Sequence, residues 1–187
     1  FSQKKYTYNN ISQLNRNRLL TTYDFADGIK TGHTSSAGYC LAASASINET
    51  RFISVIFGAN SSKARFKDTK TLFKFGFRNF ITEKYFNKNK VIAKERIWNG
   101  EEKYIDIGFN RNIYITQMKH DNSKITPKIN SFSKIQAPIR INQYLGTIDF
   151  VKDNKIISTE KIYALKRIEE GNLYRKTYDL IANFFIE

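Results

Sequence analysis

The stretch from Asp27 to Tyr39 constrains the fold most, because small residues, one cation and hydroxyls alternate there along a predicted strand. Successive side chains of a strand point to opposite faces, so Lys30 and Gly32 share one face and Thr31 lies on the other. A glycine inside a strand weakens the sheet and typically marks a place where a ligand or another chain approaches the backbone. The pattern therefore predicts a strand that lines a binding cleft.

The segments that follow extend this strand into a sheet covered by a helix. Short connections favour antiparallel pairing of predicted strands at residues 27–34, 38–47 and 51–58. The apolar period then changes from about 2 to about 3.6, which predicts a helix over residues 61–80 that lies on the sheet through Thr69, Leu72, Phe73, Gly76 and Phe80. Arg65 falls in its first turn, where a cation opposes the helix dipole and favours a carboxylate partner. Residues 1–26 are polar and predict loops, with a turn at Asn9-Asn10.

Short β-rich runs separated by turn signals predict a small all-β sandwich over residues 88–170. The runs are Val91–Ala93, Tyr104–Ile107, Ile113–Gln117, Lys134–Ile141, Tyr144–Phe150 and Ile156–Arg167. We assign Trp98 and His120 to the core or surface of this domain and not to a site. Cys40, the only cysteine, lies in an apolar run and is predicted to be a buried strand residue.

Residues 171–187 predict an amphipathic helix whose two sides differ sharply in polarity. One side carries Asn172, Arg175, Lys176, Asp179, Asn183 and Glu187, and the other carries Leu173, Tyr174, Tyr178, Leu180, Ile181, Phe184 and Phe185. Such a helix either docks on its own domain or lies in the interface of a membrane. We favour the membrane, since the segment is rich in aromatic residues but too short and too charged to span a bilayer.

The net charge of +14 indicates an anionic partner. The basic residues are spread over both halves of the chain, which argues against a dedicated nucleic-acid surface. No apolar run approaches the roughly 20 residues that a membrane span needs. The chain begins at Phe1 without an initiator Met or a signal sequence, so we expect it to be the back part of a longer protein.

The residues around Lys30-Thr31-Gly32 carry a family resemblance. Asp27-Gly28-Ile29 precedes this triplet, His33-Thr34 and Ala37-Gly38-Tyr39 follow it, and Asn15-Arg16-Asn17 lies upstream. The chain resembles, to its last residue, the serine-type D-alanyl-D-alanine carboxypeptidases, which are low-molecular-mass penicillin-binding proteins of the peptidase S11 family. These enzymes combine Ser-x-x-Lys, Ser-x-Asn and Lys-Thr-Gly motifs.

The resemblance implies an α/β fold class for residues 1–83, as the C-terminal part of a β-lactamase/transpeptidase-like catalytic domain with antiparallel strands plus a helix. The small all-β sandwich and the C-terminal amphipathic helix follow. Lys30 would supply positive charge and hydrogen bonds, Thr31 would offer its hydroxyl to the terminal carboxylate of the substrate, and Gly32 would leave room. The backbone N–H of His33 would donate to the oxyanion, and Arg65 would help to hold the carboxylate. The family implies no cofactor and no metal.

The nucleophile that this chemistry needs is missing from the chain. Three short matches do not qualify: Ser2 with Lys5 lies too near the Lys-Thr-Gly triplet, Ser131 with Lys134 belongs to the β domain, and Ser46-Ile47-Asn48 forms a hairpin turn. We therefore expect this chain to be inactive alone and the Ser-x-x-Lys motif to lie upstream of Phe1.

The favoured function is that of a carboxypeptidase fragment that removes the terminal D-alanine from peptidoglycan stem peptides by serine acyl-enzyme chemistry. Implied partners are the peptidoglycan pentapeptide, β-lactams and the anionic inner-membrane surface, which residues 172–187 would contact; nucleic acid is not among them. The implied location is the periplasmic face of the bacterial inner membrane. Two alternatives remain open, namely a class A β-lactamase fragment and a non-catalytic truncation that binds membrane or cell wall.

Overall fold

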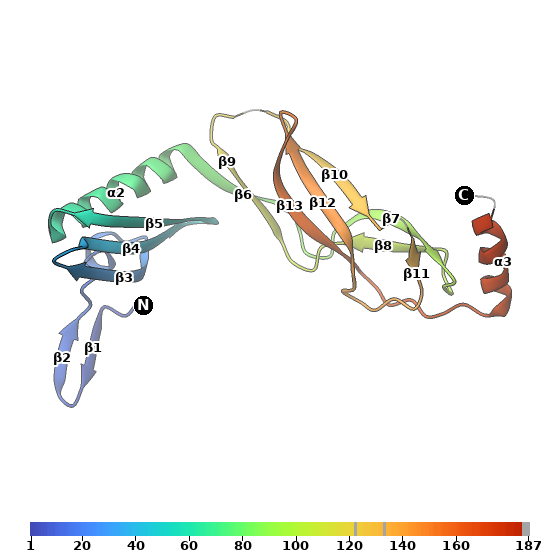
Figure 1. Cartoon of the computed structure of the whole chain (residues 1–187), viewed down its shortest axis with the longest axis horizontal. Helices are drawn as coiled ribbons and strands as arrows, with labels where there is room; N and C mark the ends of the chain where they lie inside the picture. The colour runs from blue at the N-terminus through green and yellow to red at the C-terminus, as the bar shows by residue number, and fades with distance from the viewer. Residues whose placement is uncertain (122, 133, 185–187) are drawn as a thin grey trace. The chain divides into compact units, whose positions relative to one another are not determined.

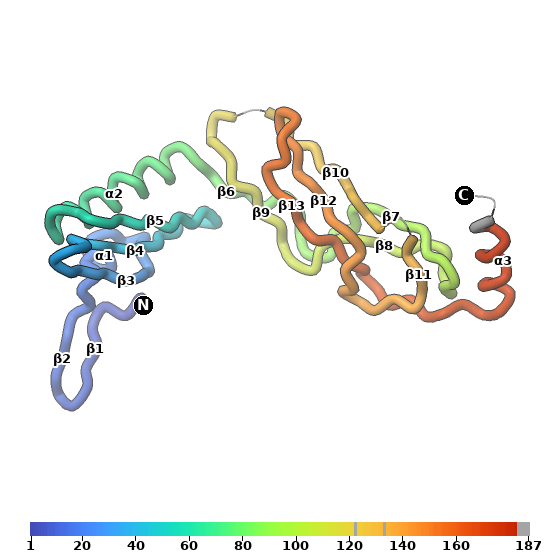
Figure 2. Tube along the Cα trace, viewed as in Figure 1, coloured from blue at the N-terminus to red at the C-terminus, as the bar shows by residue number. Residues whose placement is uncertain are grey.

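The computed structural model describes residues 1–121, 123–132 and 134–184, which divide into two compact units (Figure 1). Unit 1 comprises Phe1–Glu83 with Thr116–Asp121, and unit 2 comprises Lys84–Ile115 with Asn122–Glu187. Each unit has a separate cluster of buried apolar side chains. The chain trace in Figure 2 shows the order in which the elements follow one another.

Unit 1 is built on a three-stranded antiparallel sheet with the strand order β3-β4-β5. Its elements are β1 (Lys5–Tyr8), β2 (Ile11–Leu14), α1 (Leu19–Thr22), β3 (Ala26–Thr34), β4 (Gly38–Ile47), β5 (Thr50–Ala59) and α2 (Ser62–Asn79). In the β3–β4 register Lys30 lies opposite Ala42 and Gly32 opposite Cys40. The predicted antiparallel strands and the helix that follows them are therefore confirmed. Cys40 lies in strand β4 as predicted, but it is only half-buried, so its predicted burial was wrong.

Helix α2 packs on one face of this sheet. The hydroxyl of Ser61 accepts a hydrogen bond from the Ala64 N–H at 3.0 Å and so caps the first turn. Phe73 is 1% exposed and joins Leu19 and the inward side chains of β4 in the core. A Cβ at Gly76 would come within 3.0 Å of the Phe52 ring, so this glycine allows the helix to lie close to β5. Leu72 was predicted to face the sheet but is 48% exposed, a correction to the predicted helix face.

The first residues form a hairpin, which the sequence did not predict. Strands β1 and β2 pair antiparallel, and Asn9 and Asn10, with φ of 46° and 60°, form the two-residue turn between them. Every residue of both strands is exposed, so no alternation between buried and exposed positions is present to reveal them. The turn at Asn9-Asn10 was predicted, but the flanking residues were wrongly assigned to loops.

Unit 2 contains a six-stranded sheet with the strand order β10-β12-β13-β8-β7-β11. Its elements are β7 (Val91–Trp98), β8 (Tyr104–Gly108), β10 (Thr126–Ser131), β11 (Ile135–Gln136), β12 (Tyr144–Lys152), β13 (Lys155–Ala164) and α3 (Leu173–Phe184). All neighbouring strands are antiparallel except β11 and β7. Strands β6 (Phe80–Phe86) and β9 (Ile113–Met118) pair in a two-stranded sheet whose residues divide between the units.

The core of unit 2 lies against both of these sheets. Ile105, Ile148 and Phe150 from the large sheet cluster with Ile113 of β9, and the Phe86 ring stacks 5.3 Å from Phe109. The predicted β-rich character of this region is confirmed. Trp98 is 8% exposed, which agrees with its assignment to the core.

Two strand predictions in unit 2 needed correction. The predicted strand Lys134–Ile141 is reduced to the two residues of β11, because Pro138 has no backbone N–H to donate to a neighbouring strand. Strand β10 was not predicted, because it contains Pro127 and is mostly polar. It lies at one edge of the sheet, where a proline is tolerated.

Helix α3 docks on its own unit through its polar side. The Asp179 side chain is fully buried, and its carboxylate accepts hydrogen bonds from the Asn99 backbone N–H at 2.8 Å and from Arg96 Nη2 at 3.3 Å. Arg175 Nε lies 3.5 Å from the same carboxylate. The apolar side points to solvent, with Leu173 84% and Leu180 73% exposed.

Part of the predicted amphipathic helix lies outside the residues that the structure describes. Phe185, Ile186 and Glu187 lie outside the described residues, as do the side chains of Asn183 and Phe184. No helix within the described ranges combines the length and the apolar character that crossing a membrane requires.

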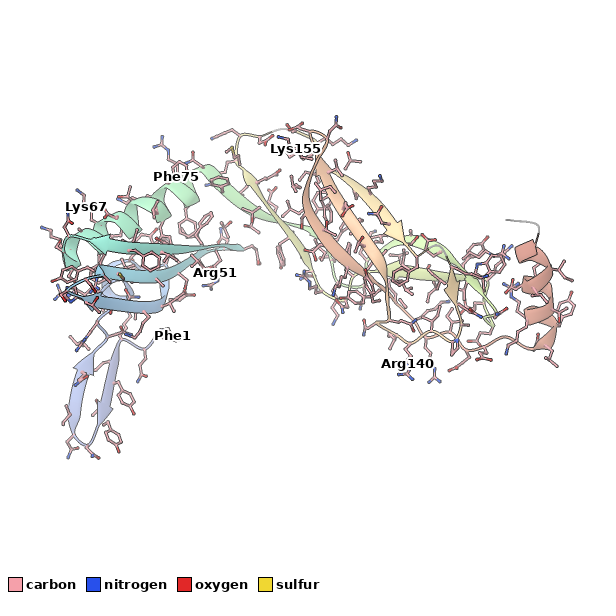
Figure 3. All side chains as sticks on the ribbon, in the orientation of Figure 1. Phe1, Arg51, Lys67, Phe75, Arg140 and Lys155 are labelled. Carbon is pink, nitrogen blue, oxygen red and sulfur yellow. The ribbon has the colours of Figure 1, made fainter. Side chains whose placement is uncertain are left out.

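A second exposed apolar surface lies on unit 1. Ile53, Val55 and Phe57 alternate along β5 and are 66%, 49% and 79% exposed. Phe75 on α2, labelled in Figure 3, is 61% exposed. Unit 1 thus leaves one side of β5 uncovered.

The Asp179 contacts predict how α3 responds to a single substitution. Asp179→Asn leaves Arg96 and Arg175 without a counter-charge, so we expect α3 to open more often and its amide hydrogens to exchange roughly 10- to 100-fold faster. Hydrogen exchange measured by mass spectrometry over residues 173–184 tests this. Asp153→Asn, in the exposed β12–β13 turn, is the matched control. Unchanged exchange in the Asp179 variant would show that its carboxylate does not hold the helix.

Candidate functional site

Strand β3, which carries Lys30, Thr31, Gly32 and His33, is one of the two edge strands of its sheet. Among the described residues only β4 pairs with it. A free strand edge presents backbone N–H and C=O groups that an extended peptide can pair with. The tertiary structure therefore places the predicted site residues where a peptide could be added to the sheet.

Lys30 and Thr31 present polar groups that are not engaged by acidic side chains. Lys30 is exposed, and its Nζ donates a hydrogen bond to the Thr31 carbonyl oxygen at 3.0 Å. The Thr31 side chain is 9% exposed, and its hydroxyl makes no side-chain hydrogen bond within the described part of the chain. These two side chains lie on opposite faces of β3, and each carries a donor that can hydrogen-bond to an anionic group.

Gly32 is not required by the packing of unit 1. A Cβ built on it would meet only the Cβ of Cys40, at 3.7 Å, which is an ordinary van der Waals contact. Gly38 differs, because its φ is +63° and an added Cβ would lie 3.1 Å from the Cα of Gly58. The small size of Gly32 therefore points to a group that approaches β3 from outside the unit.

Arg65 links helix α2 to the backbone of the sheet. Its side chain is buried, and Nη1 donates hydrogen bonds to the carbonyl oxygens of Gly32 at 2.9 Å and Cys40 at 3.1 Å. Nη2 donates to Ser62 Oγ at 3.2 Å, while Nε is buried without a partner. Burial lowers the pKa of Arg65, but a guanidinium titrates so high that it remains charged.

A basic cavity of about 540 Å³ lies beside Arg65. Its lining is Lys4, Leu14, Asn15, Arg16, Asn17, Arg18, Leu20, Thr21, Ser62 and Arg65. Four of these side chains are cationic and none is acidic, so the cavity favours an anion. Lys30, Thr31 and His33 do not line it.

Sequence reasoning missed Arg16 and Arg18 as members of this cavity. The residue that could have indicated this cavity is Asn17, which lies between the two arginines in the sequence. Its side chain is 1% exposed. Its Nδ2 donates to the Gly28 carbonyl oxygen at 2.9 Å, and its Oδ1 accepts from the Leu19 N–H at 3.2 Å. These bonds fasten the Asn15–Asn17 segment to the start of β3 and hold both arginines near Arg65.

His33 lies at the exposed end of β3, with its ring 4.1 Å from the Tyr39 ring. Its assignment as an oxyanion donor concerns the backbone N–H and stays a prediction. Among the serines considered from the sequence, Ser46 Oγ contacts the carbonyl oxygens of Asn48 and Thr50 at 3.4 Å, as expected for a hairpin residue. Across the described residues, no group of His, Cys, Asp and Glu side chains comes together in a way that could hold a metal ion.

Two protein-family models match this chain. Residues 1–61 match the model described as "D-alanyl-D-alanine carboxypeptidase", and residues 80–170 match the model described as "Penicillin-binding protein 5, C-terminal domain". The first match contains all of β3, and the second contains the six-stranded sheet of unit 2.

Similar proteins carry the same description. D-alanyl-D-alanine carboxypeptidase DacA of Escherichia coli is 38% identical over 188 residues, which cover 99% of this chain and 46% of the relative. DacF of Bacillus subtilis is 34% identical over 84% of this chain and 41% of the relative. The chain therefore spans a little under half the length of the curated relatives that it matches.

Solved structures resemble both units. The structure of penicillin-binding protein 5 from Haemophilus influenzae matches with a TM-score of 0.76 and 34% identity, over 91% of this chain and 50% of that one. The structure of penicillin-binding protein 6B from Escherichia coli matches with a TM-score of 0.54 and 28% identity, over 86% of this chain and 41% of that one.

The open space beside Gly32 leads to a prediction about stability. Gly32→Ala should change the free energy of unfolding by less than about 1 kcal/mol, since the added methyl group meets no strained contact. Gly38→Ala is the comparison variant, and its positive φ should make it less stable by about 1 to 3 kcal/mol. Urea unfolding followed by circular dichroism measures both. A Gly32 variant as unstable as the Gly38 variant would mean that the fold itself requires Gly32.

Proposed function

The chain belongs to the serine-type D-alanyl-D-alanine carboxypeptidases, and on this premise we propose that it holds the substrate peptide of an enzyme that removes terminal D-alanine from peptidoglycan stem peptides. One observation carries the proposal. The exposed edge of β3 combines the Lys30 ammonium group, the free Thr31 hydroxyl and the open space at Gly32, and buried Arg65 holds the backbone behind it.

The chemistry requires a serine nucleophile, a base, an oxyanion hole and a group that recognises a free carboxylate. In the proposed reaction the serine attacks the carbonyl carbon before the terminal D-alanine, D-alanine leaves with a proton, and water hydrolyses the acyl-enzyme. The His33 backbone N–H stabilises the oxyanion, and such a donor is worth about 3 to 4 kcal/mol. The serine and its base belong to the part of the enzyme upstream of this chain.

The role of Arg65 is limited by the hydrogen bonds it already makes. Nη1 donates to two carbonyl oxygens, Nη2 donates to Ser62 Oγ and Nε is buried, so a carboxylate can reach only the second N–H of Nη2 without rearrangement. We propose that Arg65 acts mainly through its charge and by positioning the Gly32 backbone. Arg16 and Arg18 add positive charge on the side of the cavity.

The alternative of a class A β-lactamase fragment loses support, because the relatives found here are named as carboxypeptidases and the second family model covers the β-rich region. β-Lactams remain proposed partners of the complete enzyme as acylating mimics of the peptide. The proposed reaction needs neither a metal nor an organic cofactor.

We propose that α3 associates with the outer surface of the inner membrane, on the periplasmic side. Its polar side is held by Arg96 and Asn99, so its apolar side is free to enter the headgroup boundary. An interfacial helix with leucine and tyrosine on one side and cations on the other is typical of such binding. The positive net charge supports an anionic surface as the partner.

Arg65 gives a direct test of the carboxypeptidase proposal. In the complete enzyme, Arg65→Gln should slow acylation by penicillin by about 10- to 100-fold, because a buried charged donor near the ligand carboxylate is lost. Arg65→Lys keeps the charge and should recover part of the rate. Arg78→Gln, exposed in the last turn of the same helix, is the control. Stopped-flow labelling measures the rates, and thermal unfolding confirms that each variant is folded. A folded Gln variant with the wild-type rate would refute the role of Arg65.

The missing nucleophile gives a second test. We expect the 187-residue chain by itself to take no covalent label from a fluorescent penicillin, whereas the longer protein that includes the upstream Ser-x-x-Lys motif should be labelled. Gel fluorescence and intact-mass measurement provide the readout. Stoichiometric labelling of the chain alone would show that it contains its own nucleophile, and no labelling of the longer protein would refute the proposed function.

A further inference from the structure

Helix α3 and the strands on which it docks form an open cavity of about 360 Å³. Its lining is Trp98, Asn99, Lys134, Gln136, Lys176, Thr177, Asp179 and Leu180. Half of these residues come from α3 and half come from β7, β11 and the segments beside them. The cavity therefore exists only while the helix is docked.

Two cations from outside helix α3 lie near the Trp98 ring. The Arg96 guanidinium lies 4.0 Å from the ring centre, and Lys134 Nζ lies 5.8 Å from it. Trp98 is the only tryptophan of the chain and is almost fully buried. Lys134 is exposed, and no acidic partner is found for it among the described residues. Its charge is therefore available to a ligand.

The helix adds a second available cation. Lys176 pairs at 2.5 Å with Glu170, but both side chains are about half exposed, so this surface pair contributes little and can be exchanged. The Asp179 carboxylate also lines the cavity, yet Arg96 and Arg175 neutralise it and its two oxygens accept hydrogen bonds. The sum of the charges around the cavity is therefore positive. In addition, Arg175 Nη2 is buried without a hydrogen-bond partner. The field in the cavity favours an anion.

The mouth of the cavity joins the exposed apolar side of α3. Leu180 lines the cavity and is also 73% exposed, and Ile181 next to it is 57% exposed. A soluble anion would neutralise the lysines but would leave these side chains in water. An amphiphile would suit both kinds of side chain, because its anionic head would neutralise the lysines and its acyl chain would cover the apolar side chains.

We infer that this cavity binds the phosphate headgroup of an anionic glycerophospholipid, with Lys134 and Lys176 on the phosphate and the acyl chains along Leu180. The inference rests on the membrane association proposed above and deepens it. Headgroup selectivity then comes from Lys134 of the β domain together with the helix. The helix alone would supply only the apolar contact and one of the two lysines.

Binding to lipid vesicles tests the inference, with Trp98 as the reporter. The 187-residue chain is titrated with vesicles of phosphatidylcholine with and without phosphatidylglycerol, and Trp98 emission and its quenching by a headgroup-labelled anionic lipid are recorded. The double variant K134Q/K176Q should bind the anionic vesicles about tenfold or more weakly than wild type. The control K128Q/K155Q removes the same charge from two exposed positions of unit 2, of which Lys155 is labelled in Figure 3. It should weaken binding much less.

The outcomes distinguish a failure of the headgroup site from a failure of the proposed membrane association. Equal weakening of the two double variants, or Trp98 emission that does not change on anionic vesicles, would overturn the headgroup site while leaving membrane association intact. Failure of wild type to bind either kind of vesicle would overturn both. Inorganic phosphate forms a separate arm, and a full Trp98 response to phosphate alone, with no gain from vesicles, would make the occupant a free anion and refute the lipid. Circular dichroism of each variant verifies that α3 remains folded.

Discussion

The two hydrogen bonds from the buried Arg65 guanidinium to the carbonyl oxygens of Gly32 and Cys40 are the interaction on which the candidate site depends. They join helix α2 to both β3 and β4 at the point where the sheet ends. A buried charge is costly unless its donors are satisfied, so this arrangement strongly favours one position of the edge strand. The outer edge of β3 is thereby held in place without a ligand, which would reduce the entropy lost in the proposed binding of a peptide.

Unit 2 also contains a buried charged side chain that hydrogen bonds hold in place, but here the charge is negative. Asp179 is buried between Arg96, Asn99 and Arg175, and these contacts decide which side of α3 packs and which side remains in solvent. Packing of the apolar side would have been the ordinary outcome for an amphipathic helix on a globular domain. The buried carboxylate reverses that orientation. An apolar surface is consequently left free next to a positively charged cavity.

Unit 1 also exposes apolar side chains that a complete catalytic domain would be expected to cover. Ile53, Val55 and Phe57 lie along β5, while helix α2 packs against the sheet through Phe52 and Phe73. This exposed surface and the missing Ser-x-x-Lys motif both agree with a chain that spans a little under half the length of its relatives. In the proposed function, the chain supplies an edge for the substrate and a surface for the membrane, and the proposed nucleophile belongs elsewhere.

Local periodicity by itself determined the antiparallel strands β3, β4 and β5 and the helix α2. It also determined the β-rich character of the region after residue 88 and the Lys30-Thr31-Gly32 segment. Alternation and helical spacing are properties of neighbouring residues, and for this reason the sequence alone reveals them. It failed where that signal is weak, as in the exposed β1–β2 hairpin and in β10 with its Pro127. Only the tertiary structure decided that Arg65 bonds to the backbone of β3, that Arg16 and Arg18 share a cavity with it, and that α3 packs through Asp179. Each of these depends on burial and contact between residues far apart in the chain, and a local pattern carries no information about such contacts.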